Sequence, residues 1–205
     1  MIKLHYLNRS RAKRILWLLE EIGQPYETVT YQRDAKTSLA PAELKQVHPL
    51  GKSPLIELDG FVLAESGAIT EYLIDRFAAD RLAPARETAD YAAYLQWVHF
   101  AESSAMLPLL LRMFILRDGC QTHHLLDYAQ GECAQVLTYL DRSLADKRYL
   151  VADHLTGADI MMSFIIDVLV MSNSLHHYPN LAQYAQQLQT HESWLKANAF
   201  EKQLS

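Results

Sequence analysis

The sequence is poor in cysteine, in basic surplus and in long apolar runs, and each shortage excludes a class of protein. Only Cys120 and Cys133 occur among 205 residues, so we expect no disulfide framework and a reducing, cytoplasmic location. The formal net charge of −5 leaves no positive surplus for phosphates, which argues against a nucleic-acid partner. The longest apolar stretch, 160–171, is interrupted by Ser163 and Asp167 and is too short to cross a bilayer. We therefore expect no membrane association, and the first ten residues contain no apolar run of the kind that a secretory signal requires.

What the sequence does contain is enough apolar material for a core, since 50% of its residues are hydrophobic. Its first eighty residues mix two periodicities. Apolar and polar residues alternate over 2–6, which is typical of a strand, and Asp59-Gly60 separates two short apolar runs as in a tight hairpin. The predicted elements are a strand at 2–6, a helix at 15–22, a strand at 26–31, a hairpin over 55–63 and a helix at 69–77. This order is the layout of a thioredoxin-like α/β domain.

The second half of the chain has only helical periodicity. We predict an α/β thioredoxin-like domain at 1–79, a linker at 80–86 and an all-α helical bundle domain at 87–205. Pro108 should kink or divide the first of its helices, because proline cannot donate to the helical ladder. The predicted helices are 87–117, 123–145, 157–171 and 180–197.

A proline opens one of the predicted strands and is a candidate binding feature. Pro54 follows Ser53 just before the hairpin, and proline is tolerated at the first residue of a strand. A cis bond here, which is typical of thioredoxin-like folds, would leave the backbone groups of Ser53 free to pair with an extended peptide. The alternative is an ordinary proline between a loop and a strand.

Glu65 and Ser66 stand where a strand leads into a helix. The first N–H groups of a helix have no acceptor within it and attract anions, so a carboxylate fits there. The side chain of Glu65 could hold an ammonium group beside it. Together they predict a clamp for an α-amino acid; the alternative is a plain helix cap.

Ser10 lies near the start of the first predicted helix and is our candidate for binding a sulfur. Its hydroxyl could donate to a thiolate that a ligand brings in. Arg9, Arg11 and the helix start make the surroundings electropositive, which lowers the pKa of a thiol. The alternative is that Ser10 caps the helix and the arginines are solvated.

Thr156 and Asp159 have the spacing of a capping box, with aspartate in place of the usual glutamate or glutamine. We interpret this motif as structural. It should start the apolar helix that runs to residue 171.

Taken together, these motifs make the chain resemble a cytosolic glutathione transferase of a microbial and fungal type. The resemblance covers the whole length and is carried by residues 10–21, 48–54, 63–69 and 156–159. It implies glutathione as cosubstrate, no metal, a small hydrophobic electrophile as second substrate, and a homodimer.

The resemblance also implies roles for single residues. Ser10 matches the hydroxyl of the serine-type classes; Tyr6 is the runner-up because the tyrosine-type classes take the hydroxyl from the first strand, and Asn8 is a distant third. The implied glutathione-binding residues are Lys52, Ser53, Pro54, Glu65, Ser66 and, from a neighbouring subunit, Glu102. An electrophile pocket between the domains would include Tyr94, Val98 and Met106.

Two other functions stay open on the same fold. The first is a glutathione-dependent peroxidase or disulfide reductase. The second is a non-enzymatic module that binds a protein partner, although such a module has no need of an amino-acid clamp.

Overall fold

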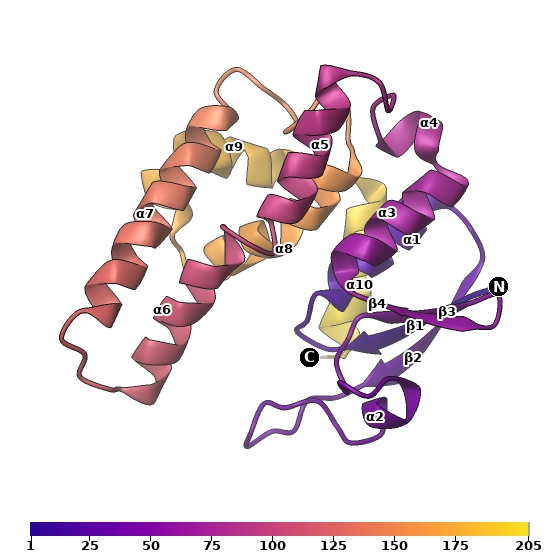
Figure 1. Cartoon of the computed structure of the whole chain (residues 1–205), viewed down its shortest axis with the longest axis horizontal. Helices are drawn as coiled ribbons and strands as arrows, with labels where there is room; N and C mark the ends of the chain where they lie inside the picture. The colour runs from indigo at the N-terminus through magenta and orange to yellow at the C-terminus, as the bar shows by residue number, and fades with distance from the viewer. Residues whose placement is uncertain (205) are drawn as a thin grey trace. The chain divides into compact units, whose positions relative to one another are not determined.

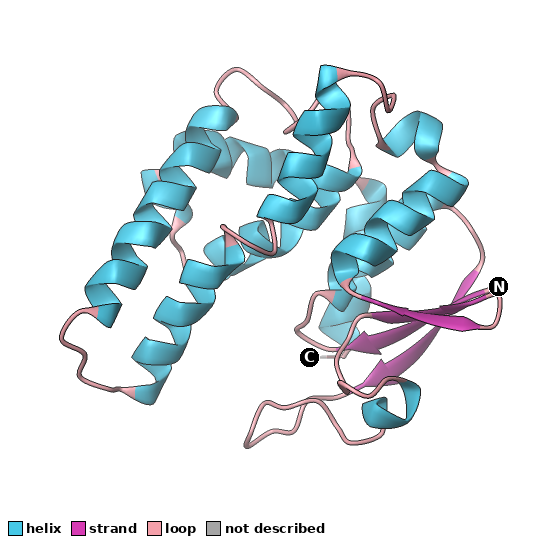
Figure 2. Ribbon diagram, in the orientation of Figure 1, coloured by secondary structure: helices cyan, strands magenta, loops and turns pink. Residues whose placement is uncertain are grey.

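A computed structural model describes residues 1–204, and the chain forms two compact units. The first unit consists of Met1–Ala85 together with Leu188–Ser205, and the second consists of Arg86–Gln187. The first unit contains all the strands, which Figure 2 shows in magenta, while the second is helical. This is the expected fold class, a thioredoxin-like α/β domain and an all-α domain.

The first unit is built on a four-stranded sheet with the order β2-β1-β3-β4 (Figure 1). β1 and β2 are parallel, whereas β3 runs antiparallel to both β1 and β4. The strands are β1 (Ile2–Leu7), β2 (Tyr26–Tyr31), β3 (Leu55–Leu58) and β4 (Phe61–Ala64). The helices that accompany them are α1 (Ala12–Ile22), α2 (Leu44–Val47), α3 (Ser66–Phe77), α4 (Ala79–Leu82) and α10 (Glu192–Gln203). α4 lies across the start of the linker expected at 80–86.

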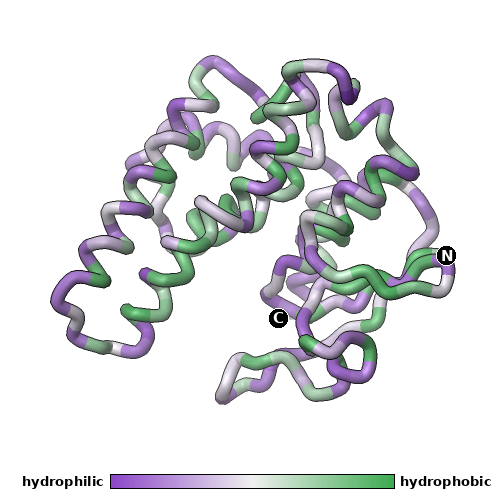
Figure 3. The backbone as a smooth tube through the Cα atoms, in the orientation of Figure 1, coloured by the Kyte–Doolittle hydropathy of each residue, from purple (hydrophilic) through white to green (hydrophobic). Residues whose placement is uncertain are grey.

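The hairpin between β3 and β4 has the predicted two-residue turn. Asp59 and Gly60 have φ angles of 51° and 85°, and a turn with two positive φ angles matches the twist of the strands it joins. Arg76 of α3 forms an ion pair with Asp59 at 2.5 Å. The two strands of this hairpin are among the hydrophobic parts of the chain in Figure 3.

The C-terminal helix α10 packs on α1 and belongs to the first unit. The indole Nε1 of Trp17 donates to Ser193 Oγ at 2.8 Å, and Ser193 in turn donates to Glu21. The ammonium of Lys13 lies 4.7 Å from the ring centre of Trp194. α1 is buried around most of its circumference as a result, which suits the continuous apolar run at 15–19.

The sequence predicts a single helix at 180–197 within a helical domain that extends to residue 205. The structure differs on both points. The segment forms two helices, α9 (Pro179–Leu188) and α10, separated at Gln189–His191. His191 is extended, with φ −66° and ψ 130°, and it turns the chain back to the first unit. Helical periodicity continues on both sides of the break, so the periodicity alone concealed it.

The second unit consists of helices, and two of them replace the single helix predicted at 87–117. The helices are α5 (Ala89–Phe100), α6 (Met106–Asp118), α7 (Leu125–Ser143) and α8 (Gly157–Met171), with a short 3-10 helix at Leu175–His177 and then α9. Pro108 stands in the first turn of α6, where the missing N–H costs little, and the chain turns at 101–105 before it. Within residues 1–204, no helix is both long and apolar enough to cross a membrane.

The capping box at the start of α8 is present as predicted. Asp159 is fully buried and accepts hydrogen bonds from the backbone N–H groups of Thr156 and Leu150, each at 2.9 Å. The hydroxyls of Thr156 and Tyr184 also donate to it, at 3.1 and 2.7 Å. The helix start is therefore closed by its own side chains.

Candidate functional site

Three polar segments meet at one end of the sheet because of the strand register. His5 of β1 pairs with Leu55 of β3, and Leu55 pairs with Ala64 of β4. The end of β1, the start of β3 and the end of β4 therefore lie side by side. This brings together the β1–α1 loop with Ser10, the Ser53–Pro54 bond and the start of α3.

The Ser53–Pro54 peptide bond is cis, as predicted. The Ser53 hydroxyl donates to the carbonyl of His5 at 2.8 Å and accepts from the N–H of Leu7 at 3.1 Å, which ties this turn to β1. Among residues 1–204, the backbone N–H and C=O of Ser53 form no hydrogen bond. They remain available to an extended peptide that runs along this edge.

α3 begins with an open end. Glu65 precedes it with φ 69° and ψ 115°, a conformation that a non-glycine residue rarely adopts, and its side chain makes no capping hydrogen bond. The first bond of the helical ladder joins the Ile69 N–H to the Glu65 carbonyl, so the N–H groups of Ser66, Gly67 and Ala68 lie outside that ladder. The exposed carboxylate of Glu65 thus stands beside a group of amide donors.

A buried arginine that the sequence motifs do not predict supports the same helix start. Arg14 is 1% exposed, and its Nη1 donates to the Ser66 hydroxyl at 3.3 Å. From the sequence, Arg9 and Arg11 are the arginines considered in this region, and Arg14 has no predicted role. Helical spacing places Arg14 on the inward side of α1, where its positive charge adds to the anion-attracting end of α3.

Ser10 lies beneath the start of α1 and is 6% exposed. Its hydroxyl donates to the Leu7 carbonyl at 2.7 Å and accepts from the Ala12 N–H at 3.1 Å. A hydroxyl has one proton and can rotate, so Ser10 would serve a thiolate by turning that proton away from Leu7. Both readings of Ser10, as a cap and as a donor, fit this geometry.

Of the two alternatives, Tyr6 is occupied as a donor, and Asn8 is bound through its side-chain oxygen. Tyr6 is fully buried, and its hydroxyl donates to Glu201 of α10. The Asn8 side chain accepts from the Arg33 N–H at 2.9 Å. Of the three candidates, Ser10 is the one whose hydroxyl lies at the helix start.

Lys52 is exposed and follows Gly51, a position with little space for a side chain. Gly51 has φ 58°, and a Cβ atom there would come within 2.7 Å of the Lys45 side chain. Glycine therefore fits this turn, which sets Lys52 next to the cis bond at Ser53.

The candidate residues of the second unit lie on and after α5. Tyr94, Val98 and Met106 are buried. Glu102 falls within the helix predicted at 87–117, but α5 ends at Phe100 and Glu102 lies in the turn that follows.

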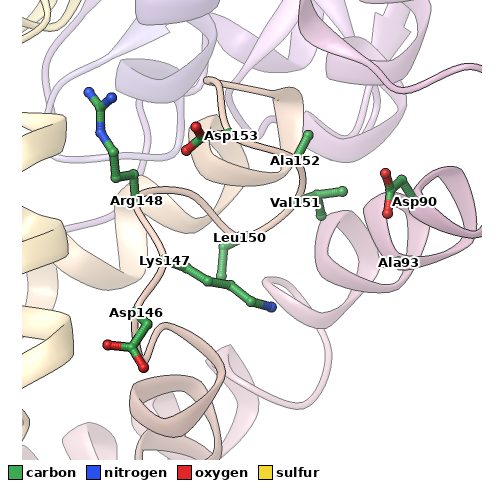
Figure 4. A pocket seen from close by; sticks show the side chains of 9 residues that line it. All are labelled: Asp90, Ala93, Asp146, Lys147, Arg148, Leu150, Val151, Ala152 and Asp153. Atoms are coloured by element: carbon green, nitrogen blue, oxygen red, sulfur yellow. The ribbon is translucent and has the colours of Figure 1, made fainter.

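A pocket of about 400 Å³ opens on the second unit, and Figure 4 shows its lining. It lies between the first turns of α5 and the segment 146–153, and it carries charged side chains of both signs. None of the predicted site residues lines it. Within residues 1–204, no cluster of three His, Cys, Asp or Glu residues could hold a metal ion.

Comparisons with known proteins agree along almost the whole chain. Residues 1–75 match the glutathione S-transferase N-terminal domain, and residues 103–192 match the glutathione S-transferase C-terminal domain. Glutathione S-transferase 1 of Saccharomyces cerevisiae is 32% identical, with 95% of this chain and 92% of that protein aligned.

Solved structures give the same result. A glutathione S-transferase from Actinobacillus pleuropneumoniae superimposes with a TM-score of 0.90 at 35% identity, covering 98% of this chain and 93% of that one. A sphingomonad glutathione S-transferase, solved in complex with glutathione, has a TM-score of 0.81 at 23% identity, with 98% of each chain covered, and so supports the fold. The chain belongs to the glutathione S-transferase family.

Proposed function

We propose that this protein conjugates the thiolate of glutathione to small hydrophobic electrophiles. The observation that carries the proposal is the convergence of three groups at one end of the sheet. Two of them are open, namely the backbone of Ser53 and the first N–H groups of α3 with the Glu65 carboxylate. The third is the start of α1, where the Ser10 hydroxyl would have to rotate toward the ligand. A γ-glutamyl tripeptide needs these three kinds of partner.

The two ends of the tripeptide would be recognised by charge. The γ-glutamyl carboxylate would lie on the N–H groups of Ser66 and Gly67, and the ammonium would lie beside Glu65. The cysteinyl unit would pair with the backbone of Ser53, next to Pro54. The exposed ammonium of Lys52 would neutralise the glycyl carboxylate.

The sulfur would then sit at the start of α1. A free thiol has a pKa of about 8.5 and is mostly protonated at neutral pH. A hydroxyl donor and a helix N-terminus both favour the thiolate, so Ser10 would raise the fraction of reactive sulfur. The protein would supply binding, orientation and charge, whereas the nucleophile would belong to glutathione.

The second unit would provide the electrophile pocket, with Tyr94, Val98 and Met106 among its apolar residues. We further propose that the enzyme is a homodimer and that Glu102 reaches the γ-glutamyl ammonium of the partner's glutathione. The free thiols Cys120 and Cys133 support a reducing location such as the cytoplasm.

Steady-state kinetics with glutathione and an activated aryl halide test the proposal. We expect Ser10→Ala to lower kcat by about 10- to 100-fold and to change the KM for glutathione much less, because the hydroxyl acts on the thiolate rather than on the tripeptide as a whole. Ser104→Ala, at an exposed position, is the matched control. Turnover of a hydroperoxide or a mixed disulfide, without conjugation, would instead assign the protein to the peroxidase or reductase function. A protein that does not bind glutathione at all would contradict both.

A further inference from the structure

The residue before Ser10 has an unusual backbone conformation that two distant charged side chains support. Arg9 has φ 50°, in the left-handed region that residues with a Cβ atom avoid. Such a conformation persists where the surrounding structure determines it. Both the N–H and the C=O of Arg9 are bound, by Glu201 and Arg33 respectively.

Glu201 reaches the loop from the C-terminal helix. One carboxylate oxygen accepts from the Arg9 N–H at 2.7 Å, and the other accepts from the Tyr6 hydroxyl. The neighbouring Phe200 packs edge-on against the Tyr6 ring, with ring centres 5.1 Å apart. Glu201 thereby joins Tyr6, near the end of β1, to the loop that follows the strand.

Arg33 also holds this loop. Its Nε donates to the Asn8 carbonyl at 3.1 Å and its Nη2 to the Arg9 carbonyl at 3.3 Å. Its Nη1 donates to the Ser38 carbonyl at 2.8 Å, which connects the loop to the segment after β2. A planar guanidinium can serve several carbonyls at fixed angles, which an ammonium group cannot do.

We propose that Glu201 and Arg33 are positioning residues for thiolate formation: they hold Arg9 in its left-handed conformation and thereby fix the Ser10 hydroxyl and the start of α1 against the glutathione sulfur. The proposal rests on the conjugating function proposed above. It gives the C-terminal helix, which Figure 1 shows in yellow within the first unit, a part in the chemistry as well as in packing.

The expected signature is a change in thiolate formation with little change in glutathione binding. The groups proposed to bind glutathione, at Ser53, Glu65 and Ser66, make no hydrogen bond to either Glu201 or Arg33. Glu201→Ala should therefore lower kcat about tenfold, leave the KM for glutathione within about twofold, and move the acid limb of the pH profile to higher pH.

The experiment compares Glu201→Ala, Glu201→Gln and the control Lys202→Ala, whose side chain is exposed on the same helix. Glutamine keeps an oxygen for the Arg9 N–H and should restore most of the turnover. The thiolate absorbance of bound glutathione, followed against pH, reports the pKa of the sulfur directly. Arg33→Lys keeps the charge and loses the fork, so it should behave like Glu201→Ala; Lys36→Ala is its exposed control.

The result that would overturn the proposal is a folded Glu201→Ala protein with the wild-type pH profile and thiolate absorbance, even if its melting temperature is lower. If Glu201→Ala does not fold, Arg33→Lys decides by the same two readouts. A wild-type protein that binds glutathione without forming a thiolate would refute the conjugating function itself. If Glu201→Ala and Arg33→Lys both turn over at the wild-type rate, only the positioning role would be refuted.

Discussion

The starts of α3 and α8 are the same kind of structure put to opposite uses. At α8, the carboxylate of Asp159 is buried and accepts four hydrogen bonds, two of them from Thr156. At α3, the carboxylate of Glu65 is exposed, makes no capping bond, and precedes a helix whose first N–H groups are outside the ladder. One helix start is closed by its own chain, and the other is left open.

The difference indicates which helix start can bind a ligand. Buried polar groups are almost always paired within a protein, and Asp159 achieves this for α8. The unfavourable backbone conformation of Glu65 at the start of α3 costs stability without closing the helix. Such conformations are concentrated at functional sites, which favours a binding role for this helix start. We therefore expect substitutions at α8 to change stability and substitutions at α3 to change binding.

The largest effect is expected at Asp159. Asp159→Ala removes four hydrogen bonds and leaves the Tyr184 hydroxyl buried without this acceptor, so the free energy of unfolding should fall by about 3 kcal/mol. Chemical denaturation measures this directly. Asp153→Ala, in the exposed part of the preceding loop, is the control and should change the value by less than about 0.5 kcal/mol. Equal losses in the two variants would show that the capping box is not what stabilises α8.

An effect of intermediate size is expected at the start of α3, where a substitution to glycine should be less harmful to stability than one to alanine. Glycine adopts positive φ angles without a steric penalty, so Glu65→Gly should be more stable than Glu65→Ala by about 1 kcal/mol. Both variants lack the carboxylate and should bind glutathione about tenfold or more weakly than the wild type. Thermal unfolding and calorimetric titration of the same two samples give both values. Similar stability of the two variants would mean that the Glu65 backbone carries no cost.

The smallest effect is expected at a third, half-exposed carboxylate. Glu57 accepts from His5 at 2.7 Å and forms an ion pair with Lys3 at 3.5 Å. The His5 hydrogen bond, followed by the charge of Lys3, holds the pKa of Glu57 below its ordinary value of 4.5, against the effect of desolvation. The pKa of Glu57 is lower in the folded chain than in the unfolded chain, so at a pH between the two values the unfolded chain binds the proton more readily. The contribution of Glu57 to stability is therefore present above about pH 4.5 and is lost as the pH falls through the folded-state value.

Glu57→Gln should therefore lower the free energy of unfolding by less than about 1 kcal/mol at pH 7, since the pair is largely solvated. The difference from the wild type should shrink below about pH 4. Glu27→Gln, exposed on β2, is the control. A difference that is independent of pH would exclude the ionic contribution.

Local patterns in the sequence predict those parts of the fold and site that local forces determine. The Asp59-Gly60 turn and the Thr156–Asp159 box each depend on a few neighbouring residues, whereas the cis bond at Pro54 is expected from the thioredoxin-like fold. The motif around Ser10, Ser53 and Glu65 could also be recognised in this way. This motif does not predict the positive φ angle of Glu65, because glutamate has no preference for that conformation.

The missing parts are those that long-range contacts determine. Tyr6 and Glu201 are 195 positions apart, and nothing in the periodicity of 180–197 indicates that the last helix returns to the first unit. The burial of Arg14 depends on the packing of α1 against β1, α3 and α10, which local patterns do not reveal. The break after Leu188 and the contacts of Glu201 and Arg33 with the β1–α1 loop became visible only in the folded chain.

The most direct test of the account is a titration of two peptides against two proteins. Glutathione and cysteinylglycine, which lacks the γ-glutamyl group, are titrated calorimetrically into the wild type and into Glu65→Ala. We predict that the wild type binds glutathione about tenfold or more tightly than cysteinylglycine, and that Glu65→Ala weakens glutathione but leaves cysteinylglycine unchanged. Equal affinities for the two peptides in the wild type, or equal losses for both in the variant, would contradict the assignment of the open start of α3 to the γ-glutamyl group.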